Sequence, residues 1–156
     1  MVAGFCACGI YSFTGASVPP SAQTATVQFF PNHAPIVVPA LSQQFTEALK
    51  NKIQSTTNLT LVSSNGDLEF SGAITDYRIQ PQAASANEIA AVNRLLITVQ
   101  VDFTNRADDN LSWSASFTRY ADYSSSADLT AVQDRLITEI VDQLVEDIFN
   151  KALANW

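Results

Sequence analysis

The most constraining feature of this sequence is an alternation between apolar and polar residues over positions 95–104, interrupted only at Leu96. Apolar side chains occupy every second position from Leu95 to Phe103. Residues 107–110 (Ala-Asp-Asp-Asn) are typical of a turn, and the alternation then resumes over 111–118. Because successive side chains of a strand point to opposite faces of a sheet, the pattern predicts an antiparallel hairpin with one apolar and one polar face.

Two more regions alternate in the same way. Residues 24–30 predict a strand with Ala25, Val27 and Phe29 on its buried side. Residues 59–64 and 67–72 flank an Asn-Gly pair at 65–66, which is a strong signal for a β-hairpin. The second arm of this hairpin is predicted to run on to about residue 79, and a loop is predicted at 81–93.

Two segments carry apolar residues at helical spacing. The first helix is predicted over residues 39–56, with Leu41, Phe45 and Ile53 on one stripe. The second is predicted to begin after a cap at Ser126 or Asp128 and to run close to the C-terminus.

The order of these elements predicts the fold class. A sheet with one apolar face and two amphipathic helices can bury its apolar surface as a two-layer sandwich. We therefore expect an α+β fold in which two helices pack on one face of a four- to five-stranded mixed or antiparallel sheet. The other face, lined with Thr, Ser, Gln and Asp, is expected to stay free.

The balance of charge narrows the classes of partner. The chain has 156 residues and a formal net charge of −7, with eight Lys and Arg against fifteen Asp and Glu. Nucleic-acid binding draws on clustered Lys and Arg, and here they are scattered, so no nucleic-acid partner is expected. No apolar run approaches the ~18 residues of a membrane helix. Attachment to a membrane would therefore require a lipid or a partner.

Residues for catalysis are scarce. His33 is the single histidine, and its place among prolines favours a turn residue over a general base. No Gly-x-Ser-x-Gly, phosphate-loop or His-Glu-x-x-His motif is present. We expect no enzymatic activity, no metal and no cofactor, although a hydrolase with paired carboxylates stays open as an alternative.

Four aromatic residues are candidates for an apolar binding surface: Trp113, Tyr120, Tyr123 and Trp156. For Trp113 alternation favours a place in the core, and Trp156 is better explained by packing at the helix end.

Two cysteines lie near the N-terminus, at Cys6 and Cys8, with Ala7 between them. A small residue before a cysteine suits lipoprotein processing, so we interpret Cys8 as a lipidation site, residues 1–7 as the remnant of a lipoprotein signal and residues 8–23 as a lipidated tether. The apolar start is shorter than an ordinary signal. The alternatives are two ordinary thiols or half of a metal site. The remainder, 24–156, is expected to form a single domain.

Short motifs are spread over nearly the whole chain after Cys8. They are CGIYSFTG at 8–15, QFFPNHAP at 28–35, FTEALK at 45–50, TNLTLV at 57–62, NGDL at 65–68, FTRY at 117–120, EDIFNKA at 146–152 and NW at 155–156. In this order they resemble the LptE-like lipopolysaccharide-assembly lipoproteins, in a divergent branch outside the enteric bacteria.

The resemblance implies a lipoprotein on the periplasmic side of the outer membrane that plugs and helps assemble an LptD-like β-barrel, which inserts lipopolysaccharide. It also implies lipopolysaccharide as a second partner. Basic residues of enteric members are implicated in contact with it, and the strand-associated candidates here are Arg78, Arg94, Arg106 and Arg119. The alternative function is a periplasmic lipid- or lipopolysaccharide-binding module of another envelope assembly.

Overall fold

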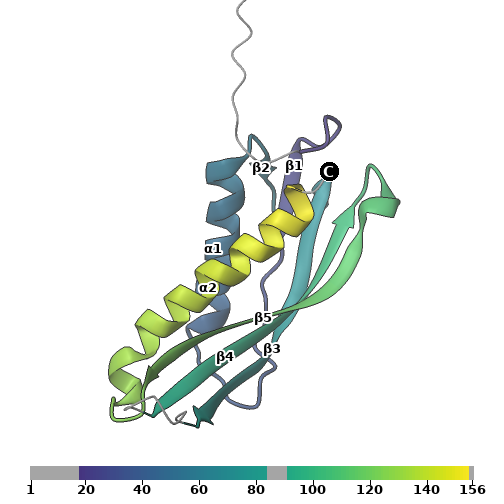
Figure 1. The fold of residues 1–156 in the computed structure, drawn as a ribbon. Coiled ribbons are helices and arrows are strands. Elements are labelled where there is room, and N and C mark those ends of the chain that lie inside the picture. The colour runs from purple at the N-terminus through teal and green to yellow at the C-terminus, as the bar shows by residue number, and fades with distance from the viewer. Residues whose placement is uncertain (1–17, 84–90, 155–156) are drawn as a thin grey trace, which may run out of the picture.

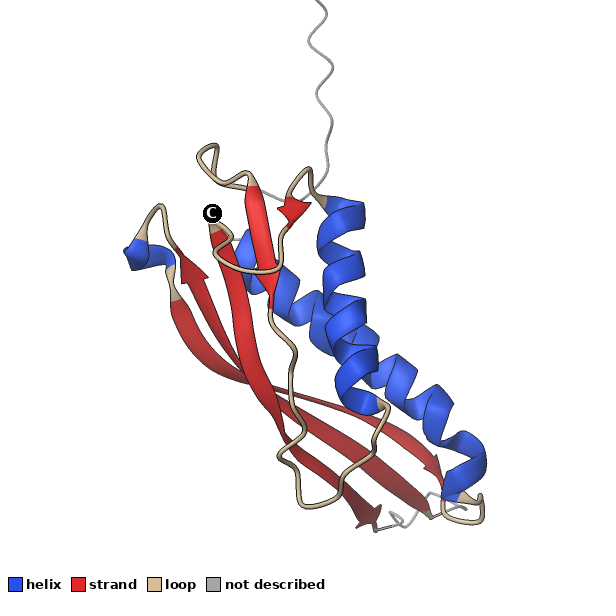
Figure 2. Cartoon of the chain, turned by 180° about the vertical axis from the view of Figure 1, so that it is seen from behind, coloured by secondary structure: helices blue, strands red, loops and turns tan. Residues whose placement is uncertain are grey.

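The computed structural model describes residues 18–83 and 91–154, which form one two-layer domain (Figure 1). The elements in order are β1 (Thr24–Val27), α1 (Leu41–Thr56), β2 (Thr60–Leu61), β3 (Leu68–Gln82), β4 (Val92–Asn105), the short 3-10 helix η1 (Asp109–Leu111), β5 (Trp113–Ser124) and α2 (Leu129–Leu153). Both helices lie on the same side of a single sheet (Figure 2). The predicted α+β two-layer sandwich is confirmed.

The sheet is mixed and has the strand order β2-β1-β3-β4-β5. β1 runs parallel to both of its neighbours, whereas β4 runs antiparallel to both β3 and β5. The β4–β5 pair is the hairpin predicted from the alternation. β3 has 15 residues, so at about 3.3 Å per residue this part of the sheet is on the order of 50 Å long.

The hairpin predicted at the Asn-Gly pair is wrong. β2 and β3 do not pair with each other, because β1 lies between them. The N–H of Gly66 donates to Thr26 Oγ1 at 2.9 Å, and the Asp67 carboxylate accepts from the N–H groups of Gln23 and Thr24. These bonds hold the connection against β1. The dipeptide does mark a turn, since Asn65 has a left-handed φ of 56°. However, β3 pairs with β1, a strand that lies far away in sequence, and not with β2.

β1 ends earlier than predicted, and this changes which phenylalanine is buried. The strand stops at Val27, and the chain after it stays beside β3 only through separate hydrogen bonds as far as His33. Phe29, predicted on the buried side, is 60% exposed, and Phe30 is fully buried instead. The N–H of Phe30 donates to Thr46 Oγ1 at 3.1 Å. Outside a strand the period of two no longer decides which side chain faces the core.

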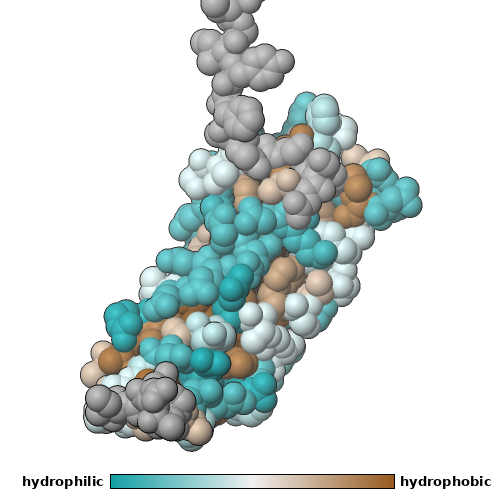
Figure 3. All heavy atoms as spheres, in the orientation of Figure 1, coloured by the Kyte–Doolittle hydropathy of each residue, from teal (hydrophilic) through white to brown (hydrophobic). Residues whose placement is uncertain are grey.

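The core lies between the helices and the sheet. Alternate residues of β4 from Leu95 to Phe103 are at most 2% exposed. They belong to one hydrophobic cluster with the predicted apolar stripes of both helices. Burial of each large side chain contributes about 1.5–3 kcal/mol. Asp128 caps α2 as predicted, with its side chain accepting from the N–H of Thr130. Figure 3 shows the helix side of the molecule, where hydrophilic atoms predominate over α1 and α2.

Two adjacent residues of β4 test the assignment of faces. Val99 is fully buried, whereas Thr98 lies on the open face opposite Asp76. We expect Val99→Lys to abolish cooperative unfolding, because a buried unpaired charge costs several kcal/mol. Thr98→Lys should keep a melting temperature within a few degrees of wild type. Circular dichroism melts of both variants would check this, and equal melting temperatures would contradict the core assignment.

Candidate functional site: the open face of the sheet

The face of the sheet opposite the helices is a broad polar surface built by β3, β4 and β5. Side chains at alternate positions of these strands point away from the core, as the period of a strand requires. Across the three strands they form rows of neighbours, such as Asp76, Thr98 and Thr118. Among the described residues, no helix or strand packs on this face (Figure 2).

Hydroxyl and amide side chains on this face form a connected hydrogen-bond network. Gln100 Nε2 donates to Ser114 Oγ at 2.8 Å, and Ser116 Oγ donates to Gln100 Oε1 at 2.5 Å. Ser114 Oγ in turn donates to the Asp102 carboxylate. The next row carries a hydrogen bond of 2.8 Å between the hydroxyls of Thr98 and Thr118. Cross-strand pairs of this kind stiffen a sheet, so the face presents polar groups in fixed positions.

The structure separates the four arginines proposed from the sequence. Arg78 and Arg94 lie in adjacent rows of the open face, Arg78 beside Leu96 and Arg94 beside Gln80. Arg106 follows β4 at the other end of that strand, where it binds Glu69 and the carbonyl oxygen of Gly66. Arg119 lies in the core-facing row of β5. The four residues therefore do not form one basic cluster.

Each of these arginines is paired with a carboxylate. The closest nitrogen–oxygen distances are 3.1 Å for Arg78–Asp76, 2.8 Å for Arg94–Asp122, 2.5 Å for Arg106–Glu69 and 2.6 Å for Arg119–Asp147. The hydrogen bonds between Arg94 and Asp122 lower the pKa of the Asp122 carboxyl and raise the pKa of the Arg94 guanidinium. Hydrogen bonds to Asp147 likewise raise the pKa of Arg119. The charge of each of these arginines is thus matched by a neighbouring carboxylate.

The candidate aromatic surface is not assembled. Tyr120 is 48% exposed on the open face, where the Arg94 guanidinium stacks 3.7 Å from its ring centre. Trp113 and Tyr123 belong to the opposite, core-facing row, and Trp113 stacks on Phe103 at 5.4 Å. Trp156 and Cys8 lie outside the described residues, as does 84–90 of the predicted loop. The alternation in the sequence predicted that Trp113 faces the core. The same alternation puts Tyr120 and Tyr123 on opposite faces of the sheet.

The acid partners of the arginines were missed in the sequence. One pair could have been predicted from the turn at 107–110, because a hairpin that folds at this turn brings Asp122 opposite Arg94. The pairing of Arg119 with Asp147 joins β5 to α2, and no local pattern relates these two positions.

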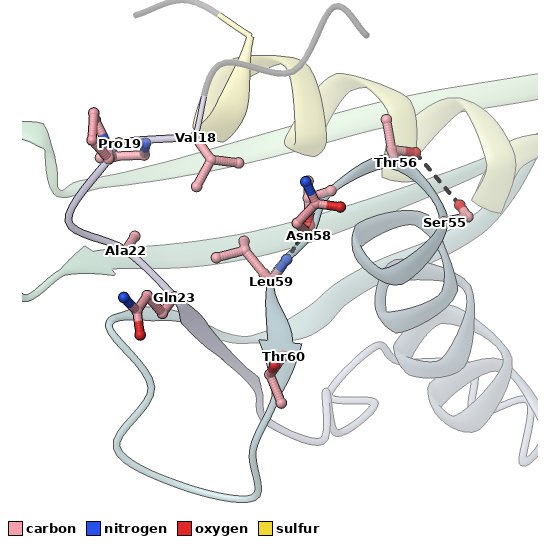
Figure 4. A pocket seen from close by; sticks show the side chains of 11 residues that line it. Val18, Pro19, Ala22, Gln23, Ser55, Thr56, Asn58, Leu59 and Thr60 are labelled. Atoms are coloured by element: carbon pink, nitrogen blue, oxygen red, sulfur yellow. Dashed lines mark hydrogen bonds between the residues drawn. The ribbon is translucent and has the colours of Figure 1, made fainter. Parts of the chain in front are cut away.

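A separate hollow lies where the chain enters β1 (Figure 4). It has a volume of about 690 Å³ and is lined by residues 18–20, 22–23 and 55–60. None of its lining residues is an acid, a base or a cysteine. Its lining offers hydroxyl groups, amides and apolar carbon for binding.

The ionisable groups that the structure describes show no arrangement typical of general acid–base catalysis. The carboxyl groups with a shifted pKa are Asp67, Asp122 and Glu146, and hydrogen bonds lower each pKa. A general acid needs the opposite shift. In the described region no cluster of three or more His, Cys, Asp or Glu could hold a metal ion. No described helix is long and apolar enough to cross a membrane.

Comparison with known proteins identifies the family. The fold and the open face define a small α+β sandwich with one polar sheet face. A model of the LptE family, described as lipopolysaccharide-assembly, matches residues 22–152, which is most of the chain. The chain therefore belongs to the LptE lipopolysaccharide-assembly family, and the resemblance seen in the motifs is confirmed. No curated protein matches the sequence.

Solved structures share the fold at low sequence identity. Uncharacterized lipoprotein B from Nitrosomonas europaea is 14% identical, with a TM-score of 0.51 over 94% of this chain and 88% of that one. The hypothetical protein CT253 from Chlamydia trachomatis is 10% identical, with a TM-score of 0.51 over 86% of this chain and 100% of that one.

The lowered carboxyl pKa values predict a loss of stability in acid. A group whose pKa is lower in the folded state stabilises the fold above its ordinary pKa, and this contribution disappears as the pH falls through the lowered value. We therefore expect the free energy of unfolding to decrease between about pH 5 and pH 3.

Asp67, bonded to the N–H groups of Gln23 and Thr24, should account for part of this decrease. Asp67→Asn should be less stable at neutral pH and lose less stability in acid. Asp134→Asn is the control, because this side chain makes no hydrogen bond among the described residues. Urea unfolding at several pH values checks this, and parallel pH profiles for wild type and Asp67→Asn would refute it.

Proposed function

We propose that this protein is an outer-membrane lipoprotein that plugs and helps assemble an LptD-like β-barrel of the lipopolysaccharide transport machinery. Membership of the LptE family supports the process. The observation that carries the plug role is the open face, a polar surface of fixed hydroxyl and amide groups. The interior of an outer-membrane barrel is polar and wet, so this face suits contact with the barrel wall.

The rest of the fold fits a rigid plug. The helices and the core lie behind the sheet and keep the open face in one shape. Because every candidate arginine is paired with an acid, contact with the barrel would rest on hydrogen bonds and shape more than on net charge. The net charge of −7 does not favour long-range attraction of an anionic ligand.

Attachment to the membrane would come from lipid on Cys8. One acyl chain anchors a protein only weakly, so a stable anchor needs several chains, as a bacterial lipoprotein cysteine is expected to carry. In this proposal residues 8–23 are the tether, and residues 24–156 are the single domain held on the periplasmic side of the outer membrane. No cofactor and no nucleic acid takes part.

Two alanine positions test the plug role with the same substitution. Ala73 lies on the open face beside Gln100, whereas Ala131 is exposed on α2. We expect Ala73→Trp to fold but to lose co-purification with the LptD-like barrel, because the large side chain would hold the open face away from the barrel wall. Ala131→Trp should still co-purify in equal amounts.

The experiment uses tagged, fully signalled protein in its native host, extracted in mild detergent and analysed by mass spectrometry. Melting temperatures confirm that both variants are folded. Equal recovery of the barrel with both variants would exclude the open face as the contact surface, and no barrel with the wild type would exclude the plug role.

Direct contact with lipopolysaccharide is a second part of the proposal. Arg78 and Arg94 are the best placed of the four candidates, because they lie in adjacent rows and Leu96 and Tyr120 beside them offer apolar contact. A phosphate group would compete with Asp76 and Asp122 for the two guanidinium groups. Bidentate Arg–phosphate pairs are strong enough for such an exchange.

Replacement of both arginines tests this contact. Arg78→Gln with Arg94→Gln should weaken binding of the isolated protein to lipopolysaccharide vesicles by roughly tenfold. Arg135→Gln is the control, because Arg135 lies on α2 and its side chain is 63% exposed. Equal affinities would contradict the contact. High affinity that depends on one arginine, in a chain that binds no barrel, would favour the lipid-binding module instead.

A further inference from the structure

β5 forms a long free edge of the sheet. It spans the 12 residues Trp113–Ser124 and contains no proline. An edge strand carries a row of N–H and C=O groups without partners, and such a row is a template for another strand. The opposite edge of the sheet is β2, which has two residues. Of the two edges, β5 therefore offers far more backbone for pairing.

The pairing of β5 with β4 shows which groups point outward. Just past β5, Ser125 donates its N–H to the carbonyl oxygen of Ala91 at 3.1 Å. In an antiparallel ladder, residues bonded to the neighbour alternate with residues that point away. The odd-numbered residues of β5 therefore bond to β4, and even-numbered residues from 114 to 122 direct N–H and C=O to the free edge. No described residue hydrogen-bonds to these outward groups.

The core-facing row of β5 is covered unevenly along the strand. Ala121 and Tyr123 are 4% and 6% exposed. Ala115 and Phe117 are only half-buried and Arg119 is exposed, although their β4 partners are fully buried. One end of the edge is thus covered, and the other leaves apolar surface open to an additional strand.

We propose that a second copy of this chain pairs with β5 in antiparallel orientation, across a two-fold axis at Thr118. In this register the residues of each pair have numbers that add to 236. The outward-pointing residues then face each other, as the hydrogen bonds require. On the open face the pairs are Ser114–Asp122, Ser116–Tyr120 and Thr118–Thr118, and on the core side they are Trp113–Tyr123, Ala115–Ala121 and Phe117–Arg119.

This register is complementary at every position. The Ser114 hydroxyl lies opposite the Asp122 carboxylate, the small residues Ala115 and Ala121 pair, and so do the aromatic residues Trp113 and Tyr123. Arg119 lies opposite the ring of Phe117, where a cation–π contact is favourable. No like charges oppose each other. Because the axis lies near the middle of β5, the two strands overlap over almost their whole length. The covered end of each copy also lies beside the open end of the other.

The strength of the pairing follows from its size and charge. A contact made mainly by one strand from each copy belongs to the small, transient class of interfaces, so the dimer should depend on protein concentration. Each copy carries a net charge of −7, and repulsion between copies is screened by salt. Added salt should therefore strengthen the dimer. The proposal concerns the edge of the sheet and is independent of the proposed function, which uses its face.

Two substitutions at one position test the pairing. Ser116→Ala and Ser116→Pro both remove the hydrogen bond from Ser116 to Gln100. The proline also removes the outward N–H, which no described residue uses, and proline is tolerated on an edge strand at such a position. In the dimer that N–H would donate to the carbonyl oxygen of Tyr120 in the second copy, and symmetry doubles the loss. Ser116→Pro should thus dimerise at least about tenfold more weakly than Ser116→Ala.

Sedimentation equilibrium of the full 156-residue chain over a range of concentrations measures this. Reducing agent prevents disulfides through Cys6 and Cys8. A wild-type chain that stays monomeric at every concentration and salt level would overturn the proposal. Equal dimerisation of the two variants would also overturn it, because the copies would then meet through another surface.

Hydrogen exchange provides a measurement that needs no substitution. At low protein concentration the amides of Ser116, Thr118 and Tyr120 should exchange quickly, while that of Phe117, bonded to β4, exchanges slowly. At high concentration the exchange of the three outward amides should slow. Rates independent of concentration would refute the pairing, even if Ser116→Pro failed to fold.

Discussion

The register between β3 and β4 is the constraint on which the rest of this structure depends. The two strands pair from Leu68–Asn105 to Gln82–Val92, with one irregularity near Ile74. A shift by one residue would turn Val99 to solvent and Thr98 into the core, because side chains alternate along a strand. The helices pack on the apolar face, and the other face is polar because most of the apolar residues of these strands point towards the helices. The buried face and the open face of the sheet thus both follow from the pairing of β3 with β4.

The open face is polar and carries charged groups of both signs. Its arginines are each matched by a nearby carboxylate, and surface ion pairs of this kind contribute little to stability. Their larger effect is on recognition. A surface of paired charges, hydroxyls and amides can exchange its hydrogen bonds with a wet polar partner, whereas a row of unpaired arginines would attract any anion. This agrees with the acidic composition of the chain.

The face and the edge of the sheet are separate surfaces with different requirements. The face presents side chains, so its partner is selected by their chemistry and shape. The edge presents backbone groups, and its selectivity must come from the side chains on either side of the added strand. Arg119 lies in the core-facing row of that edge, bound to Asp147. Inward-pointing charges at an edge discourage unspecific pairing, so this residue restricts which strands fit beside β5.

The sequence alone determined the elements whose information is local: the β4–β5 hairpin with its two faces, the apolar stripes of α1 and α2, the Asp128 cap and the α+β sandwich they imply. Motifs along the chain also indicated the family. The tertiary structure decided what depends on distant partners. It inserted β1 between β2 and β3, buried Phe30 in place of Phe29, and gave each arginine its acid. Periodicity is a property of neighbouring residues, whereas strand order and ion pairs are settled by packing between segments far apart in the chain.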